Sequence, residues 1–371
     1  MNNPIRVLQV IGIMNQGGAE TMIMNLYRNI DRSKVQFDFV ENENSGAFFD
    51  DEIRNLGGHI YHCPRFRGKN YFEYKKWWKD FFDEHDEYSA VHGHIGSTAA
   101  FYLKEAKNHG IMAIAHSHSI YVKGQNHLLY SILSYPTRNI ADYFFLCSEQ
   151  AGIDRFGKQA TSNPERAFFV PNGIDTEAFR FNVESRKNKR KEYGIKDDEF
   201  VIGHVGRFVD AKNHAFLLDV FKEAILINPS SKLLLVGDGE MHQSIEEKAE
   251  YMGLKEKTIF LGNRPDVNDL LSAMDVLVFP SKYEGLPVTL VEAQCNGLPC
   301  VISDSIPSDC VLIPELIQVR SLEENPVEWA KTALNCKTVN RIAYADKIKE
   351  TGFDIKKSAK WLEEFYLEKA K

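Results

Sequence analysis

Short apolar, β-branched runs alternate along the chain with longer stretches in which apolar residues recur every three or four positions. Residues 5–13 predict a buried strand, and in residues 19–30 the side chains of Met22, Ile23 and Leu26 share one face of a helix. This alternation is typical of a mostly parallel sheet with helices on both faces. Further strands are expected at 35–40, 59–63, 89–94, 111–116, 142–147 and 166–170, and helices near 47–57, 70–86, 97–109, 126–140 and 148–157.

The alternation is interrupted once. Residues 171–181 are rich in turn formers, and residues 184–194 are expected to be a charged, solvated stretch. The alternation then restarts, which predicts an α/β protein with two Rossmann-like, doubly wound domains facing a cleft. Such sheets bind ligands beyond the carboxyl ends of their strands. The second series has expected strands at 200–206, 232–237, 258–262, 275–280 and 299–303, and expected helices at 213–228, 241–253 and 287–296.

Composition narrows the class of protein. The 371 residues suffice for two domains, and 43% hydrophobic with 26% charged residues is ordinary for a soluble globular chain. A net charge of −7 gives no general attraction to nucleic acid. Six scattered cysteines, no signal-peptide pattern and no run of about 20 apolar residues favour a cytoplasmic protein.

Candidate anion-binding residues follow two of the expected strands. Gly17 and Gly18 open the first helix, where backbone N–H groups favour negative charge. An ordinary strand-to-helix turn would look the same. Arg207 and Lys212 follow strand 200–206 and together suit a diphosphate. Alternatively, Arg207 and Lys212 are solvated surface charges, as most arginines and lysines are.

Two carboxylates stand out near the last expected helix of the second series. Pro287 suits the first helical turn and Gly297 suits the end, so Glu284 lies in the loop before this helix and Glu292 lies inside it. The neighbours of Glu292 are apolar, and a buried carboxylate needs hydrogen-bond donors, which adjacent ribose hydroxyls would supply. Alternatively, Glu292 belongs to a polar stripe with Gln294 that faces solvent.

In these residues the sequence resembles the retaining glycosyltransferases of family four, which have the GT-B fold. The spacing of Glu284 and Glu292 is the most specific mark, and the match spans most of the chain. The HSH motif at 116–118 is most similar to the capsule and exopolysaccharide branch. The matching motifs are GGAE (17–20), VHGH (91–94), AHSHS (115–119), CSE (147–149), VPNGID (170–175), GRFVDAKN (206–213), LVGDGE (235–240), FLGNRPDV (260–267) and the segment 275–301.

The resemblance implies a role for each matching residue of the second domain. Glu292 would bind the ribose of a nucleotide sugar, while Arg207 and Lys212 would neutralise its diphosphate. The donor sugar would be held by Glu284 and by backbone N–H groups. The remaining implied donor contacts are Gly285, Leu286 and Val288 through the backbone, and Asn263 and Arg264 beside the base.

In the first domain the resemblance places Gly17 and Gly18 near the phosphate or the acceptor. His116 matches the family's histidine near the donor sugar, and His118 is a second candidate because strand alternation puts both on one face. The implied domains are an acceptor-binding domain, 1–178, onto which the last helix, 355–371, packs back, and a nucleotide-sugar-binding domain, 179–354.

The chemistry that the resemblance implies needs neither a metal nor a cofactor. A UDP-sugar is the expected donor, and a glycan or lipid-linked molecule is the expected acceptor. Oxocarbenium character develops at the anomeric carbon as the diphosphate departs, and protein cations and N–H groups stabilise the negative charge that develops on the diphosphate. The resemblance also implies that the anomeric configuration is retained, by front-face attack with a diphosphate oxygen as base.

Three alternatives stay open. Two H-x-H pairs, 92–94 and 116–118, could hold a metal in a hydrolase, although no carboxylate adjoins them in the sequence. A nucleotide-sugar epimerase could use the same GT-B architecture. A non-enzymatic two-domain protein could close on a sugar, although periplasmic proteins of that kind carry secretion signals.

Residues 65–82 combine six cations with aromatic residues at helical spacing. The simpler hypothesis is a helix whose aromatic face packs on the first sheet. The other is peripheral contact with the cytoplasmic face of a membrane, because basic, aromatic amphipathic helices bind anionic interfaces.

Overall fold

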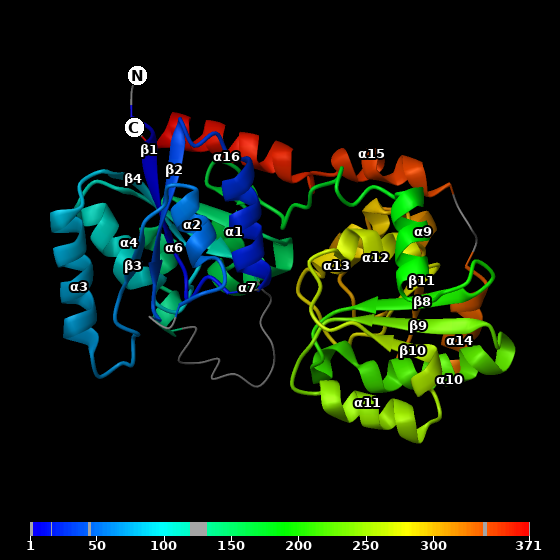
Figure 1. The fold of residues 1–371 in the computed structure, drawn as a ribbon. Coiled ribbons are helices and arrows are strands. Elements are labelled where there is room, and N and C mark those ends of the chain that lie inside the picture. The colour runs from blue at the N-terminus through cyan, green and yellow to red at the C-terminus, as the bar shows by residue number, and fades with distance from the viewer. Residues whose placement is uncertain (1–2, 16, 44–45, 119–131, 337–339, 371) are drawn as a thin grey trace. The chain divides into compact units, whose positions relative to one another are not determined.

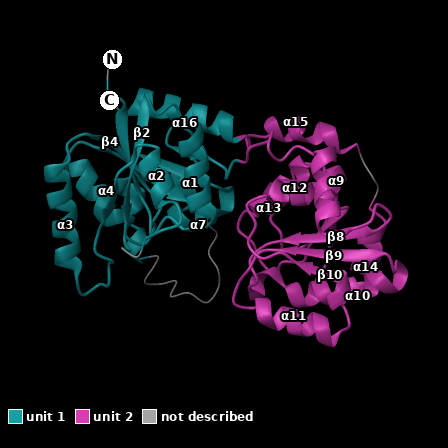
Figure 2. Cartoon of the chain, in the orientation of Figure 1, with its two compact units in different colours: residues 1–173, 355–371 teal, residues 174–354 magenta. Residues whose placement is uncertain are grey.

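The computed structural model describes residues 3–370 except 16, 44–45, 119–131 and 337–339. The chain divides into two compact units, Met1–Gly173 with Ile355–Lys371, and Ile174–Asp354 (Figure 2). The sequence analysis placed the first boundary five residues later, at 178/179. The chain enters unit 2 at Ile174, where the Ile174 N–H group donates to the carbonyl of Phe353. This bond joins the first and last segments of unit 2.

Unit 1 is built on a seven-stranded parallel sheet in the order β3-β2-β1-β4-β5-β6-β7. Its strands are β1 Ile5–Val10, β2 Val35–Glu41, β3 Ile60–His62, β4 Tyr88–Gly93, β5 Met112–Ser117, β6 Tyr143–Leu146 and β7 Ala167–Phe169. Its helices are α1 Gly18–Asn29, α2 Asp50–Asn55, α3 Tyr71–Glu84, α4 Ala99–Asn108, α6 Thr137–Ile140, α7 Glu149–Phe156, α8 Lys158–Thr161 and α16 Ile355–Lys369 (Figure 1). The expected helix at 126–140 lies partly outside the described residues.

Helices cover both faces of this sheet. One core contains side chains from α1 and from α16, whose Leu362, Phe365 and Tyr366 are buried, so the last helix belongs to unit 1 (Figure 1). The other core contains Tyr74 and Trp78 of α3. The aromatic face of α3 thus packs on the sheet, as the simpler hypothesis for residues 65–82 predicted.

Unit 2 is built on a six-stranded parallel sheet in the order β10-β9-β8-β11-β12-β13. Its strands are β8 Phe200–Val205, β9 Ser231–Val236, β10 Thr258–Phe260, β11 Val276–Phe279, β12 Cys300–Ser303 and β13 Ile317–Arg320. Its α-helices are α9 Val183–Glu192, α10 His214–Ile227, α11 His242–Tyr251, α12 Val267–Ala273, α13 Val288–Cys295, α14 Pro326–Leu334 and α15 Tyr344–Lys349. Both sheets thus have the doubly wound parallel topology that the sequence predicted.

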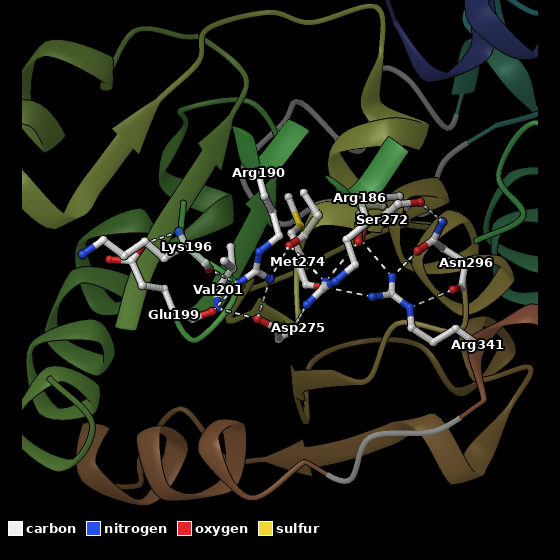
Figure 3. Close-up of polar contacts among 12 residues, drawn as sticks. Arg186, Arg190, Lys196, Glu199, Val201, Ser272, Met274, Asp275, Asn296 and Arg341 are labelled. Carbon is white, nitrogen blue, oxygen red and sulfur yellow. Dashed lines mark hydrogen bonds and ion pairs between the residues drawn. The ribbon is translucent and has the colours of Figure 1, made fainter. Parts of the chain in front are cut away.

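The charged stretch expected to be solvated, 184–194, is largely exposed except for Arg190, but most of it forms helix α9, which the sequence analysis did not expect. Arg186 donates to the carbonyls of Ser272, Ala273 and Met274 at 3.0–3.2 Å, at the C-terminal end of α12 (Figure 3). Buried Arg190 donates to the carbonyl of Ala273 at 3.2 Å. The helix is held by arginines that satisfy backbone carbonyls rather than by an apolar stripe, and so hydrophobic periodicity does not reveal it.

Candidate donor and acceptor sites

The sheet of unit 2 has a topological switch point between β8 and β11. These strands are neighbours, but β9 and β10 lie on one side of them and β12 and β13 on the other. Ligands of such sheets bind beyond the carboxyl ends of the strands at this point. The structure places Arg207 and Lys212 after β8, and Glu284 and Glu292 after β11.

A short connection leaves β8 and carries both candidate cations. Lys212 ends the 3₁₀ turn Asp210–Lys212, while the Arg207 side chain is exposed and bonds to no residue in the described part of the chain. Gly237, after β9, has φ of 129°, and a Cβ atom there would lie 2.1 Å from the Gly206 carbonyl oxygen. Glycine at this place therefore lets the ends of β8 and β9 approach each other closely.

Lys212 and Glu284 form an ion pair between the two sides of the switch point. Nζ of Lys212 lies 2.6 Å from Oε1 of Glu284, and the two side chains keep only 18% and 12% of their exposure. The same ammonium lies 4.7 Å from the ring centre of Phe279, the last residue of β11. An anionic ligand here would offer Lys212 a second negative partner.

The N-terminus of α13 presents unused backbone donors. Pro287 occupies the N-cap position and supplies no side-chain cap. The N–H groups of Glu284, Gly285, Leu286 and Val288 donate to no acceptor in the described residues. Free N–H groups together with the positive end of the helix dipole favour an anionic or hydroxyl-rich ligand.

Glu292 is a half-buried carboxylate without a partner. Its neighbours Leu290, Val291 and Ala293 are fully buried, and burial raises the pKa of Glu292 to about 7. No hydrogen bond or ion pair joins its carboxylate to any described residue. Because buried carboxylates are normally satisfied by donors, this one is available to a ligand that carries them.

Gln294 does not form a solvent-facing polar stripe with Glu292. It is fully buried, its Nε2 donates to the carbonyl of Cys310 at 2.7 Å, and its Oε1 accepts from the N–H groups of Leu312 and Ile313. Gln294 therefore binds the 310–313 segment to α13. The carboxylate of Glu292, which has no such partners, lies in a different environment.

Of the two residues expected beside the base, Asn263 and Arg264, the side chain of Arg264 is already bonded within the protein. Arg264 donates twice to Asp266 at 2.8 Å, and Lys189 lies 2.6 Å from the same carboxylate. Asn263 is exposed after β10. The Arg264 side chain thus holds a loop, and any contact from this segment to a ligand is left to Asn263 and the backbone.

In unit 1 the switch point lies between β1 and β4. Gly17 is the N-cap of α1 and Gly18 its first residue, and neither has a positive φ. A Cβ atom at Gly18 would meet only Asn172 Nδ2, at 4.0 Å. The glycine at 18 is therefore not required by packing in this structure, and its effect is to leave space at the N-terminus of α1.

Four histidines gather at the carboxyl ends of β4 and β5. Nε2 of His92 lies 3.0 Å from Nδ1 of His116, and Nδ1 of His94 lies 2.6 Å from Nε2 of His118. Burial lowers the pKa of all four rings, to about 3 for His118, so they are neutral at physiological pH. Strand alternation predicted that His116 and His118 would lie on one face.

Two further residues complete this histidine cluster, and the sequence analysis did not single out either. The Tyr366 hydroxyl, from α16, lies 2.7 Å from Nδ1 of His92, and Oε1 of Gln9, from β1, lies 2.8 Å from Nε2 of His94. Alternation along β1 puts Gln9 on the sheet face opposite to Leu8 and Val10. That signal marks a buried polar residue, but it does not identify the partner.

Nitrogen atoms of His92, His94 and His116 lie within 4.8 Å of one another, close enough for a metal. The group includes no carboxylate, and its imidazole nitrogens apart from Nε2 of His116 are engaged in the hydrogen bonds just described. The arrangement is explained by hydrogen bonding and offers nothing specific to metal-dependent hydrolysis.

Comparison with known proteins agrees with this geometry. The family model "Glycosyltransferase Family 4" matches residues 16–178, and "Glycosyl transferases group 1" matches residues 185–335. EpsF of Bacillus subtilis (strain 168), named as a glycosyltransferase, is 38% identical over 351 residues, which cover 93% of this chain and 91% of EpsF. The chain belongs to glycosyltransferase family 4.

One further relative of this glycosyltransferase and one solved structure match over nearly its whole length. The capsular polysaccharide biosynthesis glycosyltransferase CapH of Staphylococcus aureus is 24% identical over 395 residues, 98% of this chain and 99% of CapH. The crystal structure of Anabaena HepE in complex with UDP superimposes with a TM-score of 0.79 at 17% identity, over 98% of this chain and 100% of HepE. The GT-B fold expected from the sequence is confirmed.

The protein is thus a glycosyltransferase of polysaccharide biosynthesis, and neither the epimerase nor the binding-protein alternative is favoured. Within unit 2, the structure brings Lys212 and Glu284 into contact and leaves Arg207 and Glu292 unpaired. Within unit 1, it places His116 and His118 in one cluster.

Proposed function

We propose that this glycosyltransferase moves a sugar from a UDP-sugar to a glycan or lipid-linked acceptor, with retention of the anomeric configuration and without a metal. The observation that carries the donor assignment is the unpartnered, half-buried carboxylate of Glu292 beside a helix N-terminus with free N–H groups. A ribose diol supplies two donors to the carboxylate. HepE, which has the same fold, was crystallised with UDP and with UDP-glucose, and this supports a uridine nucleotide.

The diphosphate would lie on the cationic side of the switch point. Lys212 is held near its working position by Glu284, and Arg207 is free to turn toward the phosphates. Glu284 and the N–H groups of Gly285, Leu286 and Val288 would hold the donor sugar. Such preorganised donors act on charge that develops as the leaving group departs.

The reaction balances without an added base. The bond between the anomeric carbon and the β-phosphate oxygen breaks, and the acceptor hydroxyl oxygen forms the new bond on the same face. The hydroxyl proton passes to the departing phosphate oxygen, which yields the glycoside and the nucleoside diphosphate. Arg207 and Lys212 stabilise the negative charge on that leaving group, which is the task that a divalent metal has in other transferases.

A donor-binding assay tests this assignment. The full-length protein is titrated calorimetrically with a panel of nucleotide sugars, and a UDP-sugar is expected to bind most tightly. Glu292→Gln should weaken that binding by roughly 10- to 100-fold, because hydrogen bonds to a charged group contribute about 1.5–3 kcal/mol. Glu323→Gln, an exposed carboxylate of the same unit, is the matched control and should bind as the parent does. Equal affinity in parent and Glu292→Gln would contradict the ribose contact.

We also propose a peripheral contact with the cytoplasmic membrane face through the outer side of α3. There Phe72 is 84% exposed beside Lys75 and Lys76, while the opposite face of the helix is buried in the core. None of the described helices is long and apolar enough to cross a membrane. Co-sedimentation with anionic vesicles should fall when Lys75, Lys76 and Lys79 are changed to Glu; unchanged co-sedimentation would remove this contact.

A further inference from the structure

His204, the penultimate residue of β8, is a fully buried histidine close to Lys212. Its Nδ1 lies 2.9 Å from the carbonyl oxygen of Val278, in the neighbouring strand β11. Burial, with a smaller contribution from the charge of Lys212, lowers the pKa of His204 to about 4. The ring is therefore neutral at physiological pH.

The carbonyl of Val278 decides which ring nitrogen of His204 carries the proton. A carbonyl oxygen can only accept, so Nδ1 of His204 is protonated and donates to it. The other nitrogen of a neutral imidazole is an acceptor. Nε2 of His204 is buried and bonds to no residue that the structure describes. Because a buried acceptor without a donor is unfavourable, its lone pair is available to a donor that can move towards it.

The side chain of Lys212 borders the space next to this lone pair. A Cβ atom built on Gly206 would lie 3.2 Å from Nε2 of His204 and 3.4 Å from both Cδ and Cε of Lys212. The ring of Phe279 stacks on His204 with ring centres 5.3 Å apart, and its centre lies 4.7 Å from the Lys212 ammonium. Since Nζ is bonded to Cε, rotation about the last side-chain bonds of Lys212 moves the ammonium within the space that glycine at 206 leaves open.

The two partners within reach of Lys212 differ in charge. In the free protein Lys212 donates to Oε1 of Glu284 at 2.6 Å. A carboxylate partner cancels the charge of the ammonium, whereas a neutral imidazole leaves the pair positive. The ammonium has three N–H donors, so a bond to His204 leaves two for other acceptors. A pair of Lys212 with His204 therefore stabilises a bound diphosphate better than a pair of Lys212 with Glu284.

We propose that Lys212 exchanges its partner when the donor binds. Glu284 turns to the sugar, and the ammonium of Lys212 donates one hydrogen bond to Nε2 of His204. His204 is then a positioning residue, because it acts through Lys212. The exchange during catalysis rests on the proposed function, whereas the proton position on His204 and the pairing of Lys212 with its Nε2 do not.

His214 is the other side chain with an N–H group near Nε2 of His204. The two ring centres lie 4.6 Å apart with their planes at 76°, and neither nitrogen of His214 bonds to a residue in the described part of the chain. His214→Phe keeps an aromatic ring at this position and removes the N–H group. This variant therefore separates a bond from His214 from a bond from Lys212.

Histidine ¹⁵N resonances of the full-length protein without any ligand provide the first test. Long-range ¹H–¹⁵N correlation distinguishes protonated, bare and hydrogen-bonded ring nitrogens, and His204→Asn assigns the signals. In the parent, Nδ1 of His204 should be protonated and Nε2 bare, because Glu284 holds Lys212. In Glu284→Ala, Nε2 should shift to the lower frequency of an accepting nitrogen. Adding Lys212→Met to Glu284→Ala should abolish that shift.

Each of three results in this experiment would overturn the proposal. The first is a proton on Nε2 of His204 in the parent. The second is an Nε2 resonance that is the same in Glu284→Ala as in the parent. The third is an Nε2 that is already hydrogen-bonded in the parent and becomes bare in His214→Phe, because His214 would then be its partner.

Two changes at His204 form a matched pair for transfer kinetics. The amide of Asn replaces Nδ1 as the donor to Val278 but does not extend to the position of Nε2, whereas the amide oxygen of Gln reaches that position. Both changes remove the ring, so they share the loss of packing. With the UDP-sugar that binds most tightly in the calorimetric panel, His204→Asn should lower kcat about tenfold with a smaller change in donor KM. His204→Gln should recover most of that loss, and equal kcat values in the two folded variants would contradict the positioning role.

The two experiments separate this inference from the proposed function. If Nε2 of His204 accepts from Lys212 in Glu284→Ala but no UDP-sugar binds, the pairing holds and the proposed donor fails. If sugar is transferred from a UDP-sugar and His204→Asn has the kcat of the parent, the proposed donor holds and the exchange of partners fails.

Discussion

The two ends of the unit 2 sheet differ in how completely their charged side chains are paired. Before β8 and β11, three arginines donate to backbone carbonyls (Figure 3). Asp275 accepts from two of them, Arg186 and Arg190, and from the N–H group of Val201. After the same strands, Arg207 and Glu292 have no partner among the described residues. A charge with its partners in place stabilises the fold, whereas one without them is a cost unless a ligand supplies them.

Arg341 shows how far the partnered end is satisfied. It is 9% exposed, and it donates to the carbonyls of Met274 at 2.8 Å, Leu271 at 2.9 Å and Asn296 at 3.1 Å. Its guanidinium also lies over the ring of Phe181, 4.4 Å from its centre. Burial lowers the pKa of Arg341 to about 9. These bonds join the end of α12 to the end of α13, so the cluster is a structural joint.

The largest effect is expected from Arg341→Met. This change leaves several buried carbonyls unbonded, and breaking a buried charged network costs about 3–5 kcal/mol. The melting temperature should fall by roughly 10 °C, since each kcal/mol shifts a unit of this size by about 2–4 °C. Calorimetric affinity for a UDP-sugar, measured well below the transition, should stay as in the parent. Lys347→Met removes an exposed ion pair with Glu315 and should leave the melting temperature nearly unchanged. Equal destabilisation by both changes would contradict the comparison.

A smaller effect, this time on turnover, is expected from Lys212→Ala. Removing one preorganised donor from developing charge typically lowers kcat by about 10²–10³-fold, with a smaller change in donor affinity. Steady-state transfer kinetics measure both. Lys282→Ala is the matched control, because Lys282 pairs with Asp210 at 2.5 Å nearby but is 41% exposed. Similar losses of kcat in the two variants would show that general charge, and not the Lys212 position, matters.

The same contrast explains what the sequence could predict. Strands and helices with an apolar face were located, and Pro287 and Gly297 bounded α13 well enough to place Glu284 outside the helix and Glu292 inside it. Helix α9 was missed because its stability depends on arginines that reach carbonyls almost 90 residues away. Local pattern contains no information about such partners.

The candidate sites show the same limit. Because ligands bind beyond the carboxyl ends of strands, the sequence identified Lys212 and Glu284 as separate candidates. Their ion pair joins residues 72 positions apart, and it follows only from β8 and β11 being neighbours. In unit 1 the H-x-H spacing identified the histidines, whereas Gln9 and Tyr366 act from β1 and α16. Residues that position others through tertiary contacts leave weak signals in a single sequence.

The smallest predicted effect is a trade of stability against binding at Glu292. Its pKa is raised from 4.5 to about 7 in the folded protein, so the folded state resists ionisation. A raised carboxyl pKa leaves stability intact below about pH 4.5, and stability is lost as the pH rises toward 7. Glu292→Gln cannot ionise, and relative to the parent it should gain on the order of 2 kcal/mol between about pH 5 and pH 8.

Thermal unfolding of parent and Glu292→Gln at both pH values measures this difference. Burial also raises the pKa of Glu41 in unit 1 to about 7, but Glu41 is present in both proteins and its effect cancels in the comparison. A donor ribose favours the ionised carboxylate and lowers its pKa, so binding should release a proton and tighten from about pH 5 to 7. Calorimetry in two buffers of different ionisation enthalpy measures that proton. A pH-independent stability gain together with no proton release would mean that Glu292 already has partners, and the two ends of the sheet would then not differ.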